Sequence, residues 1–133
     1  MWIVLGMMVA CGGGVGTGVG ASSGTEDHAL RSDMSLEAFA AVYSATSRLI
    51  DVRTPEEFAS GRVPRAIHVP MADLSTAHPA IASHPKTEPL YLICHSGGRS
   101  AMAAETLAAA GFQTVNVLGG TEEWISSGRD VER

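Results

Sequence analysis

Residues 90–100 read Leu90-Tyr91-Leu92-Ile93-Cys94-His95-Ser96-Gly97-Gly98-Arg99-Ser100, and an alanine-rich segment follows them. Four apolar residues in a row predict a strand that is covered on both faces, as in the middle of a parallel sheet. The glycines predict a short loop, and the alanines predict a helix over residues 100–110 that ends at Gly111. Cys94 is thus expected at a strand end in front of a helix, where proteins lower the pKa of a cysteine and use its sulfur as a nucleophile.

Further strands and helices alternate around this stretch. Apolar residues at helical spacing predict a helix over residues 35–43, and Thr54, Pro55 and Glu57 are typical of the start of another. We expect strands at residues 48–52, 66–70 and 114–118, a short helix within residues 71–82, and a last helix after Gly119-Gly120 that carries Trp124. This alternation predicts an α/β fold with a central parallel sheet of about five strands between two helix layers.

Composition and charge narrow the classes of partner. The chain has 133 residues, of which 45% are hydrophobic and 17% charged, and its formal net charge is −5. Lys and Arg are not clustered, so we expect neither a nucleic-acid groove nor electrostatic binding to an anionic membrane surface. We expect no metal ion, because the histidines outside the cysteine loop lack ligand spacing; they are His28, His68, His78 and His84.

Residues 1–11 are interpreted as a lipoprotein-like signal. An apolar stretch ends at Ala10, Cys11 follows, and three glycines come next. This order resembles a bacterial lipoprotein signal, in which Cys11 would be lipidated and the protein anchored to a membrane outside the cytoplasm. A cleaved signal, a spanning segment and a cytoplasmic tail remain alternatives, because no Lys or Arg precedes the apolar run. Residues 12–33 predict a flexible Gly/Ser-rich tether, so we expect the folded domain over residues 34–133.

Four motifs carry a resemblance to a known family. They are residues 49–53 with Glu57 and Phe58, residues 61–67, residues 94–100, and residues 118–120 with Trp124. In these motifs the chain resembles the single-domain rhodanese-like sulfurtransferases. Three positions depart from the family pattern, which has His and Gly in the second motif and often Ala before the tryptophan; here they are Arg62, Arg65 and Glu123.

The resemblance implies a rhodanese-like three-layer α/β/α fold and sulfur transfer through Cys94. Cys94 would take a sulfane sulfur from thiosulfate or a persulfide donor, become a persulfide, and pass the sulfur to cyanide, a thiol or a protein acceptor, with no cofactor. The binding loop would consist of His95, Ser96, Gly97, Gly98, Arg99 and Ser100. Asp51, Arg53 and Glu57 would support this loop, and we expect an ion pair between Arg53 and Glu57.

The loop residues themselves favour a reactive thiolate. Gly97 and Gly98 allow successive backbone N–H groups to point inward around the sulfur. The start of the following helix adds partial positive charge, and Arg99 adds a full one. We therefore expect Cys94 to be ionised at neutral pH.

Two other classes of function remain open. A module of the same fold could hold a persulfide for a partner without turning over thiosulfate. Cysteine-dependent phosphatases and arsenate reductases are the second class, but they place an arginine one position later than Arg99, which lies five residues after Cys94. The shorter loop suits a single sulfur atom better than a phosphate.

Overall fold

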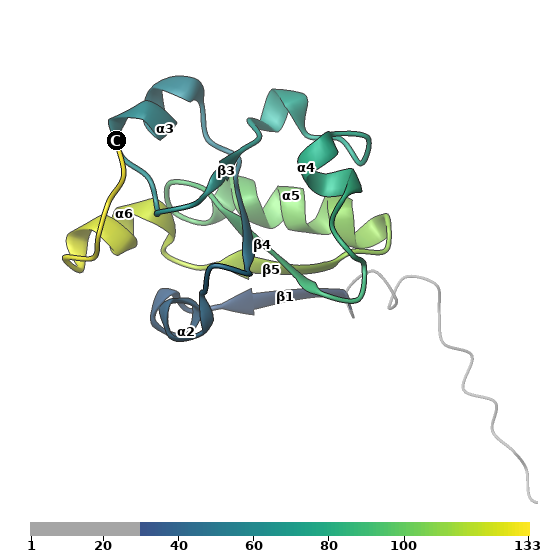
Figure 1. Cartoon of the computed structure of the whole chain (residues 1–133), viewed down its shortest axis with the longest axis horizontal. Helices are drawn as coiled ribbons and strands as arrows, with labels where there is room; N and C mark the ends of the chain where they lie inside the picture. Colours follow the sequence, from purple (N-terminus) through teal and green to yellow (C-terminus); the bar gives the residue numbers. More distant parts are fainter. Residues whose placement is uncertain (1–29) are drawn as a thin grey trace, which may run out of the picture.

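The computed structural model describes residues 30–133, in which strands and helices alternate (Figure 1). The strands are β1 (Arg31–Met34), β2 (Arg48–Asp51), β3 (Ile67–His68), β4 (Pro89–Ile93) and β5 (Gln113–Val117). The helices are α2 (Leu36–Val42), α3 (Pro55–Ser60), α4 (Pro79–Ala82), α5 (Gly98–Ala109) and α6 (Gly120–Ser126), with a 3-10 turn η1 at Met71–Asp73. Cys11, for which lipidation is predicted, lies outside the described residues.

The five strands form one parallel sheet in the order β1-β5-β4-β2-β3. The chain leaves β2 toward the β3 edge and leaves β4 toward β5, so the connections that follow these two neighbouring strands diverge. In open α/β sheets, ligand sites lie outside the carboxyl ends of the strands at such a point. The predicted parallel α/β sheet is confirmed, and Cys94 directly follows the central strand β4.

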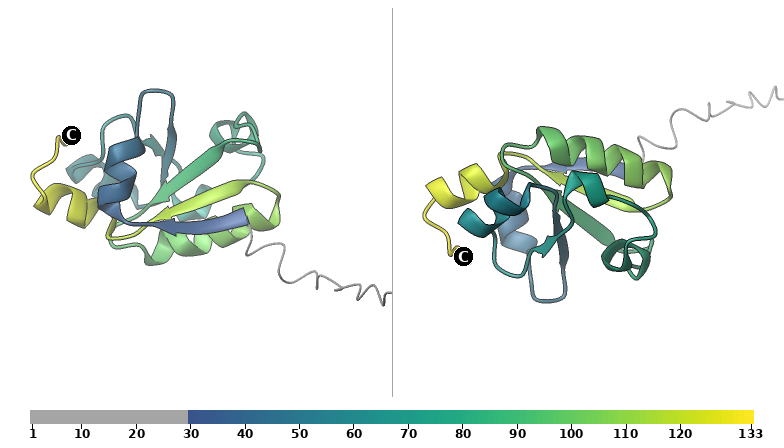
Figure 2. Two further views of the ribbon diagram at one scale, coloured as in Figure 1. Left: turned by 90° about the horizontal axis from the view of Figure 1, so that it is seen from below. Right: turned by 90° about the horizontal axis from the view of Figure 1, so that it is seen from above.

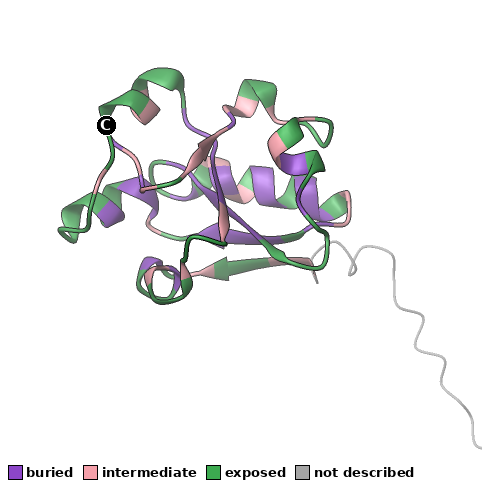
Figure 3. Cartoon of the chain, viewed as in Figure 1, coloured by how far each residue is buried: buried purple, intermediate pink, exposed green. Residues whose placement is uncertain are grey.

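The sheet is covered on both faces, as the apolar run of β4 predicted. Alternate residues of a strand face opposite sides, so Leu92 packs in one core with Leu107 of α5, whereas Ile93 packs in another with Phe39 of α2 and Trp124 of α6. Figure 2 shows α2 and α5 on opposite sides of the sheet, and Figure 3 shows burial concentrated in the central strands. Full burial of one large apolar side chain stabilises the folded state by about 1.5–3 kcal/mol.

Strand β1 includes residues that precede Met34, where the folded domain was expected to begin. Residues 31–34 form β1, an edge strand that pairs in parallel with β5. Arg31, Ser32 and Asp33 carry no apolar pattern, so the sequence provides no strand signal. Backbone hydrogen bonds to β5 form this strand, which places Asp33 beside Asn116.

The segment between β3 and β4 differs from the single short helix expected within residues 71–82. It contains η1 at Met71–Asp73 and, after a turn, α4 at Pro79–Ala82. Pro79 occupies the first turn of α4, and the His78 side chain accepts a hydrogen bond from the Ala80 backbone N–H. A proline is favoured at a helix start and disfavoured inside a helix, so two short elements replace one.

Candidate active site

Cys94 lies at the carboxyl end of β4 and is almost fully buried, with 1% of its surface exposed. The backbone N–H of Gly97 donates to the Cys94 Sγ at 3.1 Å, and the Ser100 hydroxyl lies 3.3 Å from the same sulfur. Gly97 precedes α5 with a left-handed φ of 113°, which a residue with a side chain rarely adopts. This backbone turn lets the loop curl around the sulfur.

The hydrogen bonds of the loop stabilise the thiolate form of Cys94. Burial by itself raises the pKa of the Cys94 thiol, because a charge loses hydration in the interior. The Ser100 hydroxyl and the backbone N–H groups of Ser100, Gly97 and Ser96 outweigh this effect and hold the pKa below its ordinary value. The described structure therefore provides a cradle of donors for a negatively charged sulfur.

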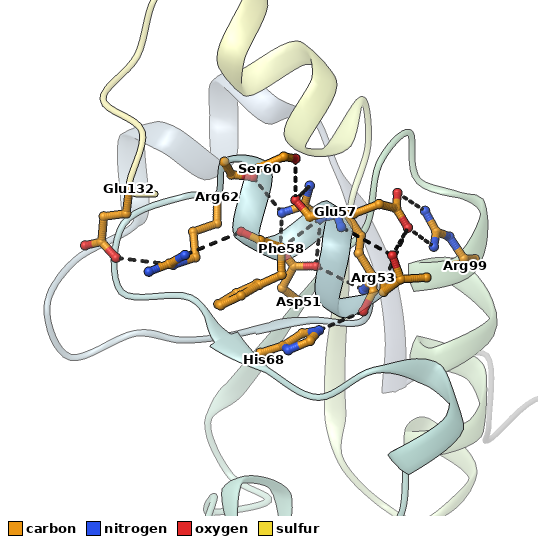
Figure 4. A network of polar contacts seen from close by, with 11 residues as sticks. Asp51, Arg53, Glu57, Phe58, Ser60, Arg62, His68, Arg99 and Glu132 are labelled. Carbon is orange, nitrogen blue, oxygen red and sulfur yellow. Dashed lines mark hydrogen bonds and ion pairs between the residues drawn. The ribbon is translucent and has the colours of Figure 1, made fainter.

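Arg99 points its guanidinium at Glu57 of α3. Its two Nη atoms donate to the two carboxylate oxygens of Glu57, each at 2.7 Å (Figure 4). Glu57 also accepts from the backbone N–H and hydroxyl of Thr54, which completes a capping box at the start of α3. The Arg99 hydrogen bonds are the main reason that the pKa of Glu57 falls to about 2. The charge of Arg99 is thus balanced by Glu57. The hydrogen bonds of the loop, rather than the Arg99 charge, lower the pKa of the Cys94 thiol.

Asp51 and Arg53 form a buried ion pair beneath this contact. The Nη2 of Arg53 lies 2.7 Å from Asp51 Oδ2, and the two side chains are 3% and 0% exposed. Arg53 also donates to the backbone carbonyls of Gly61 and Glu57. The expected ion pair between Arg53 and Glu57 is therefore wrong: the buried Asp51 carboxylate takes the guanidinium because a buried charge needs a partner. This pair holds the turn from which α3 presents Glu57.

The start of α6 packs against the cysteine loop from the other side. Backbone N–H groups of Thr121 and Glu122 donate to the carbonyls of Cys94 and His95 at 2.9 and 3.0 Å. A Cβ atom on Gly120 would lie 2.6 and 2.5 Å from the same two oxygens, so only glycine permits this approach. The His95 side chain is exposed and lies 3.4 Å from the Glu122 carboxylate. His95 therefore contributes its backbone to the loop, while its ring faces outward.

One surface hollow borders the cysteine loop, and a larger one lies apart from it. A hollow of about 350 Å³ borders the loop at Ser96 and is otherwise lined by α6 and Gly119. A larger one of about 590 Å³ lies between Tyr43, Arg65 and Trp124, and its lining contains no loop residue. The larger hollow therefore belongs to the α2 and α6 face rather than to Cys94.

Asn116 is a site residue that the sequence analysis did not select. It lies in β5, is 2% exposed, and its Oδ1 lies 2.6 Å from the Ser100 hydroxyl oxygen. A polar side chain inside an otherwise buried strand is the signal that could have identified it, because such groups are satisfied by specific partners.

Residues 30–133 contain neither a candidate metal site nor a candidate membrane-spanning helix. Among them, no three His, Cys, Asp or Glu side chains gather in a way that could hold a metal ion. No helix within this part of the chain has the length and apolar character needed to cross a membrane.

Comparison with known proteins identifies the same region of the chain. The family described as "Rhodanese-like domain" matches residues 35–127. A sulfurtransferase of Allochromatium vinosum is 35% identical over 62% of this chain and 76% of its own length. YrkF of Bacillus subtilis, whose name describes a sulfur carrier protein, is 35% identical over 69% of this chain, which spans 50% of that protein. A rhodanese-like domain protein from Staphylococcus aureus superposes with a TM-score of 0.63, at 33% identity, over 77% of this chain and 99% of its own.

Proposed function

Since the chain belongs to the rhodanese-like domain family, we propose that it is a sulfurtransferase that uses Cys94 as its nucleophile. The observation that carries this proposal is the set of donors around the Cys94 Sγ, from Gly97 and Ser100. Similarity to a sulfurtransferase that the chain covers over most of its length supports the class of reaction.

In the proposed reaction, the Cys94 thiolate attacks the outer sulfur of thiosulfate. A new S–S bond forms to Cys94, the S–S bond of thiosulfate breaks, and sulfite leaves with the electron pair. The loop N–H groups then hold the negative charge of the terminal persulfide sulfur. An acceptor thiolate or cyanide attacks that sulfur, and the Cys94 thiolate is restored as the leaving group. A persulfide donor and a protein acceptor use the same two steps.

The test combines intact mass with turnover. We expect incubation with thiosulfate to add the mass of one sulfur atom, and thiosulfate with cyanide to yield thiocyanate. Cys94→Ala removes the attacking atom, so both signals should disappear while the circular dichroism spectrum is retained. Full activity in Cys94→Ala would refute the mechanism.

A sulfur carrier is the second candidate, favoured by the similarity to YrkF. It predicts the same mass increase at Cys94 without multiple turnovers of free thiosulfate. Comparing the amount of adduct with the amount of thiocyanate per enzyme separates the two. Absence of the adduct, together with hydrolysis of an aryl phosphate, would instead support the phosphatase-like class.

We also propose that Cys11 is lipidated and anchors the domain outside the cytoplasm. This proposal rests on the apolar run before Cys11 and the glycines after it. In a bacterial host, Cys11→Ser should move the protein from the membrane fraction to the soluble fraction. Unchanged membrane association of this variant would contradict lipidation at Cys11.

A further inference from the structure

Asn116 is a buried amide whose polar groups all contact the cysteine loop or β1. Its Nδ2 donates to Asp33 Oδ1 at 3.2 Å and lies 3.4 Å from the carbonyl oxygen of Gly97. Its Oδ1 accepts from the Ser100 hydroxyl at 2.6 Å. Ser100 is fully buried in the first turn of α5 and also lies against Cys94. A chain of polar contacts therefore joins Asp33, Asn116, Ser100 and Cys94.

The two acceptors beside Nδ2 determine the orientation of the Asn116 amide. If the amide were rotated by half a turn, Oδ1 would face the Asp33 carboxylate and the Gly97 carbonyl, and neither can donate a hydrogen bond. The register of β1 with β5 places Asp33 opposite Asn116, so the edge strand helps to enforce this orientation. Oδ1 must therefore face the Ser100 hydroxyl.

Ser100 has one hydroxyl proton and three acceptors within reach. They are Asn116 Oδ1 at 2.6 Å, Cys94 Sγ at 3.3 Å and the Gly97 carbonyl at 3.3 Å. The short distance favours donation to Oδ1, which leaves the lone pairs of the hydroxyl oxygen for the Cys94 S–H. If the proton turns to the sulfur, two oxygens face each other at 2.6 Å without a proton between them. The Asn116 carbonyl and the Cys94 sulfur thus compete for one proton.

We propose that Asn116 is a positioning residue that acts through Ser100: it keeps the Ser100 proton away from Sγ while Cys94 is neutral or carries a sulfur, and releases it when the thiolate forms. The part that concerns the sulfur-carrying state rests on the proposed function, because only a sulfur-transferring cysteine enters that state. The thiolate then gains a donor at the moment it becomes the nucleophile or the leaving group.

The charged groups around Cys94 are paired with one another, so they do not replace this effect. Each neighbouring element contributes such a pair or one member of it: Arg99 of α5 with Glu57 of α3, Asp51 of β2 with Arg53, and Asp33 with Arg31 in β1. On the α6 side, the exposed His95 ring lies beside the exposed Glu122 carboxylate. We therefore assign the adjustment of the Cys94 charge state to the direction in which the uncharged Ser100 hydroxyl donates.

The test measures the pH dependence of Cys94 alkylation by iodoacetamide in the absence of any sulfur donor. Alkylation is followed by mass spectrometry of the proteolytic peptide that contains Cys94, because Cys11 can react as well. Asn116→Leu removes the competing acceptor, so Ser100 can donate fully to the thiolate. We expect the pH midpoint of Cys94 alkylation to fall by about one pKa unit in this variant. At a pH below the midpoint, this fall corresponds to roughly tenfold more thiolate. Ser100→Ala should raise the midpoint, because the donor is lost.

A double variant shows whether Asn116 acts through Ser100. In the Ser100→Ala background, Asn116→Leu should leave the midpoint unchanged, since no hydroxyl proton remains to be redirected. A shift that persists in this background, or an unchanged or higher midpoint in Asn116→Leu alone, would overturn the proposal. If Asn116→Leu fails to fold, Asn116→Val, which suits a strand, is expected to give the same fall.

Thr114→Val is the matched control. Thr114 lies two residues before Asn116 in β5, is 1% exposed, and donates to the backbone carbonyl of Ala104 rather than to Ser100. This variant loses a buried hydrogen bond of the same strand and should keep the wild-type midpoint. Alkylation needs no sulfur transfer, so the two proposals can fail separately. If Asn116→Leu lowers the alkylation midpoint as expected but the wild-type protein forms no persulfide, the proposed function is refuted and the effect of Asn116 on the Cys94 pKa stands.

Discussion

Glu57→Gln tests whether the ion pair with Arg99 holds the cysteine loop to α3. The variant keeps the size of the side chain and one oxygen that can accept from Thr54, but it removes the negative charge. Arg99 then loses its charged partner, while the buried pair of Asp51 and Arg53 is untouched. We expect a less stable fold and a pH dependence of stability that differs from the wild type.

The expected loss follows from the pKa of Glu57, which falls from 4.5 to about 2. At about 1.4 kcal/mol per pKa unit, this fall corresponds to roughly 3.5 kcal/mol without solvent screening. The side chains of Arg99 and Glu57 are 37% and 32% exposed, so water weakens the attraction. Exposed pairs contribute up to about 1 kcal/mol, and the two parallel hydrogen bonds place this pair above them, at about 1–2 kcal/mol.

The pH dependence has a defined direction. A carboxyl whose pKa is lower in the folded state stabilises the fold above its unfolded pKa, and this contribution is lost as the pH falls. The difference in unfolding free energy between wild type and Glu57→Gln should therefore be full at pH values above 4.5 and shrink toward a pH of about 2.

Urea denaturation at a series of pH values measures this difference. Glu56→Gln is the control, because Glu56 is an exposed neighbour in the same first turn of α3 and loses the same charge near the helix start. Its effect should be only a few tenths of a kcal/mol. An equal loss in both variants, or a Glu57→Gln loss that stays constant down to acidic pH, would refute the assigned role of the ion pair.

Two further predictions concern the supports of the loop. Asp51→Asn leaves the guanidinium of Arg53 buried without its anion, so the unfolding free energy should fall by about 3–5 kcal/mol in thermal denaturation; a loss below about 1 kcal/mol would show that the pair behaves like a surface contact. Gly120→Ala places a Cβ within 2.6 Å of the carbonyl oxygen of Cys94, and chemical denaturation should show a loss of at least about 1–3 kcal/mol. Gly98→Ala, where a Cβ would have nothing within 4 Å, should be neutral or stabilising; equal effects of the two glycine substitutions would contradict this packing.

The sequence by itself determined the parallel α/β sheet and the position of Cys94 at a strand end. These features depend on local patterns: an unbroken apolar run in β4, a capping box before α3, and glycines that interrupt the chain after the cysteine. Such patterns act within a few residues, so they can be interpreted without knowing what lies beside them in space. The family motifs are local in the same sense.

Only the tertiary structure decided which side chains meet around the loop. Arg99 and Glu57 are 42 positions apart in the chain, and Ser100 and Asn116 are 16 apart, so their pairing depends on how the sheet aligns its strand ends. The assignment of Arg53 to Asp51 rather than to Glu57 likewise follows from burial, because the carboxylate with no access to water takes the guanidinium. The edge strand β1 has no sequence signal, since its backbone pairs with β5 while its first three side chains are polar.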